Sequence, residues 1–158
     1  MTSLSQALLS QAHWDWLPLQ GTASQFSPAE IRQAIADLVQ ADRLGMADAL
    51  SAAGLSLYPD SEDILAISAL LAELRQEWSM AGDLLEQLIT LQAGQTPGTT
   101  WLHYIRVLRC QCNPAKAMAA VELALQQHPD HADLQKEAQS LRAQFNPSQL
   151  AVESTQKH

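Results

Sequence analysis

The chain has 158 residues, of which 47% are hydrophobic and 16% charged, and its formal net charge is −8. That length and apolar content suffice for one domain with a sizeable core, and they exclude intrinsic disorder for most of the chain. Proteins that neutralise phosphates need positive charge, so nucleic acid and anionic membrane surfaces are poor partners. The negative charge lies in residues 28–96, which hold eleven acidic and three basic side chains.

The expected compartment is the cytoplasm. The two cysteines, Cys110 and Cys112, are too close in sequence to link distant parts of the chain. No apolar run approaches the roughly 20 residues of a membrane span, and no secretory signal begins the sequence. We therefore expect a soluble protein without membrane insertion.

The apolar residues follow helical spacing throughout and β-branched runs are absent, so the sequence predicts an all-α fold. Ser27, Pro28 and Glu30 form a capping box with proline at the first helical position, which starts a helix. After a break at residues 41–45, a second helix extends to Pro59.

The next two helices are again predicted from capping residues and apolar spacing. Asp60 is expected to cap the third helix, and a fourth follows residues 78–79. Residues 94–100, which include Pro97 and Gly98, are the clearest loop.

The last three helices are predicted from their start signals. A fifth helix begins near Trp101, and Asn113 with Pro114 starts a sixth. Asp130 is expected to cap a seventh helix, and the polar tail 146–158 is expected to be flexible.

Small residues recur at equivalent points of these helix pairs. Ala47, Ala81 and Ala117 are separated by 34 and 36 residues. A helix–turn–helix period near 34 residues is typical of stacked repeats, in which neighbouring pairs cover each other's apolar faces. We expect the small side chain where the two helices of a pair cross closely.

With this period the chain resembles the tetratricopeptide repeat family. The first repeat, 28–61, matches through Ala47, Gly54 and Pro59, although Ile31 replaces the usual tryptophan. The second, 62–97, keeps Ala69 and Ala81 but has Leu88 where a small residue is usual, and a two-residue insertion lies near its end. The third, 98–131, matches best, through Trp101, Tyr104, Leu108, Ala117, Ala124 and Pro129.

The resemblance implies a right-handed α-α superhelix of three helix pairs over residues 28–145. An N-terminal helical segment, 1–27, would precede it, and a capping helix, 131–145, would close it. The family binds an extended peptide or helix in a concave groove without a cofactor. The positions that the resemblance assigns to this groove are Ala29, Arg32, Ala36, Val39 and Gln40 in the first repeat, Asp63, Ala66, Leu70, Glu73 and Leu74 in the second, and Thr99, Leu102, Arg106, Arg109 and Cys110 in the third.

The basic end of this groove allows the most specific prediction about a ligand. Arg106 and Arg109 lie in a predicted helix, 101–112, that contains no acidic residue. Arginine binds carboxylates bidentately, so this helix is a candidate site for an acidic partner stretch. Alternatively, both arginines pair with acids of the preceding repeat, such as Glu73 or Glu77.

Other kinds of site find little support in the sequence. His103 and Cys110 share a helix face, but two ligands do not make a metal site, and no metal or cofactor is predicted. No nucleophile–base pair or phosphate loop is present, so we expect no catalysis. The carboxylate clamp of some family members is not expected, because Ala36 stands where it needs asparagine.

Outside the repeats, the segment from Leu4 to Trp16 is predicted to form a short amphipathic helix. Either it covers the edge of the first repeat, or it forms a dimerisation arm or mimics the ligand, because exposed tryptophans mark interfaces. The candidate interface residues are Leu4, Leu8, Trp14 and Trp16.

We therefore expect a non-catalytic protein–protein interaction module, an adaptor or chaperone-like protein that holds a partner segment. Size, charge and architecture also resemble those of bacterial type III secretion chaperones, without a specific motif. A self-associating scaffold and a helical enzyme are the remaining alternatives; the enzyme would need a polar pocket that the sequence does not locate.

Overall fold

The computed structural model describes Leu4 and residues 23–145, and this part of the chain is helical. It contains seven α-helices, labelled α3 to α9, and no strand, which confirms the predicted all-α class. None of these helices is long and apolar enough to cross a membrane. Leu8, Trp14, Trp16 and the tail 146–158 lie outside the described residues.

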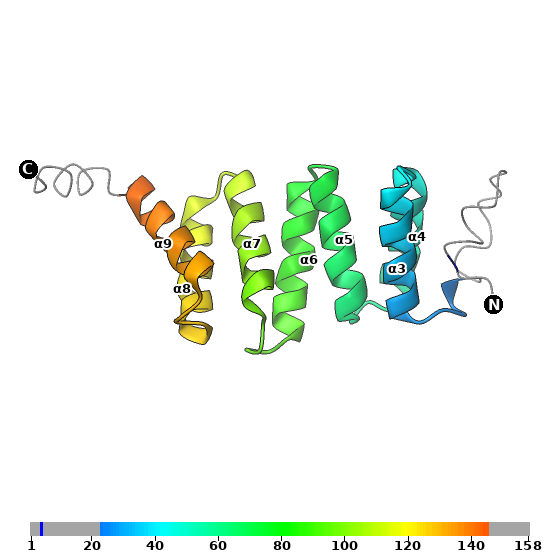
Figure 1. Ribbon diagram of the computed structural model, residues 1–158, viewed down its shortest axis with the longest axis horizontal. Helices are drawn as coiled ribbons and strands as arrows, with labels where there is room; N and C mark the ends of the chain where they lie inside the picture. Colours follow the sequence, from blue (N-terminus) through cyan, green and yellow to red (C-terminus); the bar gives the residue numbers. More distant parts are fainter. Residues whose placement is uncertain (1–3, 5–22, 146–158) are drawn as a thin grey trace, which may run out of the picture. The chain divides into compact units, whose positions relative to one another are not determined.

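The chain divides into two compact units, Met1–Leu91 and Gln92–His158, called here the N-terminal and C-terminal units. The N-terminal unit contains α3 (Pro28–Gln40), α4 (Leu44–Leu57), α5 (Glu62–Leu74) and α6 (Trp78–Leu91) (Figure 1). The C-terminal unit contains α7 (Gly98–Cys110), α8 (Pro114–Gln127) and α9 (Ala132–Phe145).

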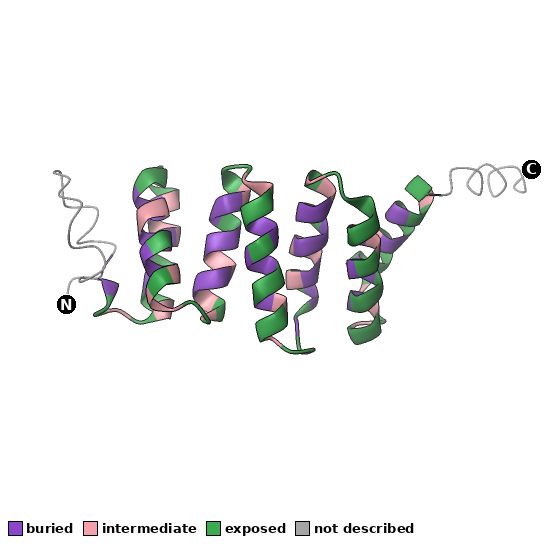
Figure 2. Cartoon of the chain, turned by 180° about the vertical axis from the view of Figure 1, so that it is seen from behind, coloured by how far each residue is buried: buried purple, intermediate pink, exposed green. Residues whose placement is uncertain are grey.

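The core of the N-terminal unit forms where α3 packs against α4 and α5 and where α5 packs against α6. Buried and exposed residues alternate along the helices (Figure 2). Helical spacing predicts one apolar face on α3; its residues Ile31, Ala34, Ile35 and Leu38 are fully buried, whereas Val39, the fifth, is partly buried. Leu4 is also buried and belongs to the same cluster.

Two serines lie in the otherwise apolar core of this unit. The hydroxyls of Ser51 on α4 and Ser68 on α5 are hydrogen-bonded to each other at 2.7 Å, and both residues are buried. A buried hydroxyl without a partner is costly, so each serine satisfies the other. The pair thus joins α4 to α5 by a polar contact that the apolar pattern did not indicate.

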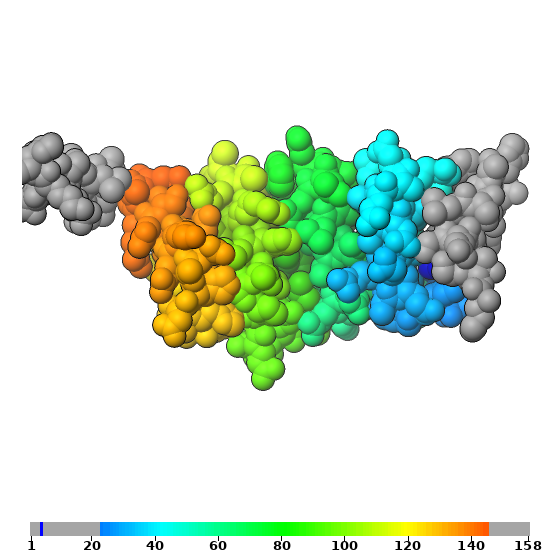
Figure 3. All heavy atoms as spheres, in the orientation of Figure 1, coloured from blue at the N-terminus to red at the C-terminus, as the bar shows by residue number. Residues whose placement is uncertain are grey.

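In the C-terminal unit, α7 packs against α8 and α9, and α8 and α9 lie side by side (Figure 3). Trp101 is 4% exposed, and its indole Nε1 donates to Gln127 Oε1 at 3.1 Å. On α9 the buried side chains are Leu134, Ala138 and Leu141, which follow helical spacing, whereas Phe145 at the end of the helix is 50% exposed.

The turns inside the helix pairs repeat the same backbone conformation. Asp42, Gln76 and Cys112 have φ values of 57°, 60° and 54°, and they are spaced by the same 34 and 36 residues as the recurring alanines. All three alanines are fully buried. Each turn closes with a hydrogen bond from the next N–H to the carbonyl five residues back, which is the Schellman pattern of helix ends. These bonds run from Arg43 to Leu38 at 2.8 Å, from Glu77 to Ala72 at 2.9 Å and from Asn113 to Leu108 at 3.0 Å.

The loop between α6 and α7 is packed rather than loose. Thr96 is fully buried, and its carbonyl oxygen is 2.7 Å from Nε2 of His128 at the end of α8. A side chain at Gly98 would collide with the His131 ring, since an added Cβ would stand 2.4 Å from its Cδ2 atom. The loop is therefore held by the turn between α8 and α9.

Two of the predicted helix starts are confirmed in detail. The Glu30 N–H donates to the Ser27 hydroxyl, which completes the capping box of α3. The Ser27 hydroxyl donates to the Glu30 carboxylate at 2.7 Å and the Ser27 N–H does so at 2.8 Å, and these bonds hold the pKa of Glu30 below its usual value. At α8, the Asn113 side chain accepts from the Lys116 N–H at 3.2 Å.

Other predicted ends and faces were wrong. The N-cap of α5 is Ser61 rather than Asp60, and α9 begins at Ala132, so Asp130 is one residue too early to cap it. Helical spacing alone would also put Leu74, a predicted groove residue, on the apolar face of α5, but it is 61% exposed at the end of that helix. Asp60 and Ser61 are adjacent residues of capping type, and a helix start is defined only to within one or two residues by such signals.

Candidate functional site

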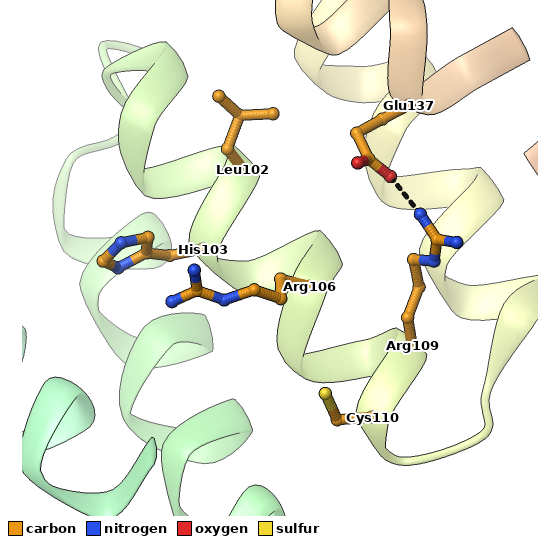
Figure 4. A pocket seen from close by; sticks show the side chains of 6 residues that line it. All are labelled: Leu102, His103, Arg106, Arg109, Cys110 and Glu137. Carbon is orange, nitrogen blue, oxygen red and sulfur yellow. Dashed lines mark hydrogen bonds and ion pairs between the residues drawn. The ribbon is translucent and has the colours of Figure 1, made fainter. Parts of the chain in front are cut away.

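A cavity of about 530 Å³ lies on α7 in the C-terminal unit, and we call it the α7 cavity. Its lining combines three basic or titratable side chains, one acid, one thiol and one leucine. These residues are Leu102, His103, Arg106, Arg109, Cys110 and Glu137 (Figure 4).

The helical period explains why these residues gather on one side of α7. Trp101, Ile105 and Leu108 are buried, which fixes the inward face of the helix. Leu102 and Arg106 are one turn apart, and Arg109 follows after three more residues, so all three share the side of the helix next to the buried face. Four of the five groove positions predicted in the third repeat line the α7 cavity; the fifth, Thr99, is exposed and is not part of its lining.

One arginine of the cavity is held by the last helix. The Arg109 guanidinium contacts the Glu137 carboxylate of α9 at 2.6 Å, and each side chain is 34% exposed. Such a short, charge-assisted hydrogen bond fixes the direction of the guanidinium. The alternative prediction, a pairing with Glu73 or Glu77 of the preceding repeat, is not what Arg109 shows: its partner is Glu137 on α9, further along the chain.

The remaining side chains that line the cavity all belong to α7. The guanidinium of Arg106 is turned toward the imidazole of His103, and the Cys110 thiol points into the same space (Figure 4). Both cysteines are free thiols. Among the described residues, no group of three histidine, cysteine, aspartate or glutamate side chains could hold a metal ion. His103 and Cys110 therefore have no third ligand beside them among these residues.

In the N-terminal unit the predicted groove residues lie on α3 and α5, which pack together. Arg32 on α3 forms an ion pair with Asp63 on α5 at 3.4 Å, and both side chains are well exposed. Leu70 and Leu74 lie one turn apart on α5 and are 38% and 61% exposed. Glu73 is half-buried between them. The exposed surface of α3 and α5 therefore combines two leucine side chains with one ion pair.

The candidate interface residues of the N-terminal segment have different outcomes. Leu4 is 4% exposed and packs in the core cluster of the N-terminal unit, so its side chain covers that core. For this residue the burial favours the covering role over an interface. Leu8, Trp14 and Trp16 lie outside the described residues.

Glu137 is the residue of the α7 cavity that the sequence did not identify. It precedes the buried Ala138 and follows Leu134 by three positions, so the apolar pattern of α9 places it at the edge of the buried face. An acid at the edge of a face that covers a basic helix was the available signal. Neither the protein-family models nor the curated proteins contain a match to this chain.

Proposed function

We propose that this protein is a non-catalytic protein-binding module with the superhelical architecture of the tetratricopeptide repeat family. The recurrence of one turn conformation at 34- and 36-residue spacing supports this proposal, as do the three buried alanines at the same spacing. In such a module the inward faces of the helices build the frame, and the outward positions are left to contact a partner.

The observation that carries the proposal is the lining of the α7 cavity. Four positions selected only by their place in the repeat pattern gather around one hollow, together with His103 and Glu137. Most ligand sites combine apolar surface with a few polar groups that fix orientation, and this cavity offers Leu102 beside two guanidinium groups. We infer that it receives an apolar side chain next to an acidic one.

The exposed leucines of the N-terminal unit extend this description of the partner. Leu70 and Leu74 offer apolar contact one helical turn apart, and the paired Arg32 and Asp63 add little net charge. A segment that binds the α7 cavity would therefore place its acidic residues opposite α7, and one that binds the N-terminal unit would offer apolar side chains to Leu70 and Leu74. This is the binding expected of an adaptor or a chaperone-like protein.

Site-specific crosslinking tests the proposal most directly. A photo-reactive amino acid in place of Leu102 should capture the partner segment in cells of the source organism, and mass spectrometry would identify it. The same replacement at Gln126, which is exposed on α8 and outside the cavity, is the matched control. Equal capture from both positions would contradict binding at the α7 cavity.

Charge reversal then tests the two arginines. The double change Arg106→Glu and Arg109→Glu should abolish capture and leave the helical circular dichroism unchanged, because both side chains lie outside the core. Lys136→Glu with Arg142→Glu changes the net charge equally on exposed positions of α9 that do not line the cavity. Loss of capture in this control as well would indicate a general charge effect instead of a site.

A further inference from the structure

The ion pair between Arg109 and Glu137 places a carboxylate of the chain itself at the basic part of the α7 cavity. Both residues line the cavity, and their 2.6 Å contact is the geometry that an external carboxylate would adopt on Arg109. Each side chain is 34% exposed, so the pair is reachable from solvent. Glu137 therefore occupies the position that an acidic group of a ligand would need.

Glu137 can leave this position without moving α9. The helix is anchored by Leu134, Ala138 and Leu141, which are at most 1% exposed, and these contacts do not depend on the ion pair. Partly exposed ion pairs contribute little to stability. A rotation of the Glu137 side chain is thus enough to open Arg109, and the helix stays docked.

We propose that Glu137 is a specificity-determining residue of the α7 cavity, where it competes with the ligand for Arg109. This inference rests on the proposed function, because it assumes that the cavity binds a peptide segment. A glutamate or aspartate of the ligand gains Arg109 only by displacing Glu137, whereas a neutral side chain leaves the pair intact. The competition lowers the affinity for acidic segments and makes it depend on how well their carboxylate reaches the guanidinium.

Two blocked peptides that differ at one position provide the probe. The acidic peptide is acetyl-Leu-Glu-Leu-Leu-amide, and the neutral one carries glutamine in place of glutamate. Both are titrated into the full chain and into Glu137→Gln, with backbone amide shifts of α7 and the Arg109 Nε–Hε signal as readouts. Glu122→Gln removes the same charge from an exposed position of α8 outside the cavity and serves as the control.

The expected result is selective. Glu137→Gln should raise the affinity for the acidic peptide about two- to fivefold, which corresponds to the strength of a partly exposed ion pair. Affinity for the neutral peptide should not change, and Glu122→Gln should alter neither. In the unmodified chain the acidic peptide should move the Arg109 signal, and the neutral peptide should not.

The other outcomes separate the two proposals. Equal effects of Glu137→Gln on both peptides, or none on either, would overturn the competition and leave binding at the cavity intact. A lower affinity of Glu137→Gln for the acidic peptide would show that Glu137 helps to orient Arg109, and would also overturn it. Absence of α7 shifts with both peptides in every variant would overturn this inference, whereas the crosslinking from Leu102 decides the proposed function separately.

Discussion

The two units share a backbone pattern and differ in the chemistry that they present. Residues 1–91 carry twelve acidic and three basic side chains, a net charge of −9, whereas residues 92–158 carry five and six, a net charge of +1. The turns after α3, α5 and α7 nevertheless have a left-handed residue at the same position and the same closing hydrogen bond. The frame is thus independent of the charge on its outward positions, and such positions can acquire binding chemistry without altering the fold.

The cores of the two units differ as well. Ile31 on α3 and Trp101 on α7 occupy equivalent positions of the repeat pattern, and both are buried. The tryptophan spans from α7 to Gln127 on α8 through its indole nitrogen, whereas the N-terminal unit uses the hydroxyls of Ser51 and Ser68 to join α4 to α5. Each unit therefore has its own polar contact between buried helix faces.

Truncation of these two equivalent residues is the strongest test of the division into units. Trp101→Ala should destabilise the C-terminal unit by about 3–5 kcal/mol, and Ile31→Ala should destabilise the N-terminal unit by about 2–5 kcal/mol, because each leaves a cavity in a packed core. Chemical denaturation measures the loss, and hydrogen exchange detected by mass spectrometry locates it. Loss of protection spread equally over both units in either variant would show one cooperative unit instead of two.

The buried serine pair provides a smaller test within the N-terminal unit. Ser51→Ala should lower the free energy of unfolding by about 1–3 kcal/mol, since it leaves the Ser68 hydroxyl buried without its partner. The double change Ser51→Ala and Ser68→Ala should recover part of this loss in the same denaturation experiment. A double variant that loses the sum of the two single effects would contradict a coupled pair.

The start of α3 should give the smallest effect and a dependence on pH that the start of α7 lacks. Ser27→Ala should lower the free energy of unfolding by about 1 kcal/mol at pH 7. Because the pKa of Glu30 is lowered in the folded chain, its hydrogen bonds stabilise the fold above the unfolded pKa of about 4.3, and this stabilisation is lost as the pH falls through the folded pKa.

Thermal melts between pH 7 and pH 3 measure this contribution. Glu30→Gln should reduce the fall of the melting temperature at the acidic end of that range. No side chain caps α7, so Thr99→Ala, at the start of that helix, is a matched control that should leave the pH dependence unchanged. A pH profile of Glu30→Gln identical to that of the unmodified chain would contradict the role of the carboxylate.

Much of the fold could be predicted because it depends on local signals. The capping box at Ser27 and the start of α8 at Asn113 follow from side chains within three residues of the groups that they bind. The buried face of α3 follows from helical spacing alone. The predictions that Asp60 and Asp130 cap helices were wrong, because aspartate is common both at helix N-caps and elsewhere in tight turns.

The site could be predicted only on its own helix. Leu102, Arg106 and Arg109 were found because their spacing on α7 is a property of one helix. Glu137 could not be found in this way, because its contact with Arg109 spans 28 positions and depends on how α7 and α9 pack. The serine pair was missed for the same reason, since one hydroxyl among apolar residues gives no sign of the second.

The repeated turn also has a practical use as a matched pair of attachment points. Cys112 is an exposed thiol at the left-handed position of the turn between α7 and α8, and Asp42 holds the same backbone position, also exposed, between α3 and α4. With Cys110→Ser to remove the thiol in the α7 cavity, Cys112 accepts one fluorescent label, and Asp42→Cys accepts a second in an equivalent setting. Energy transfer between the two labels would then follow, in real time, how the two units respond when a partner segment binds.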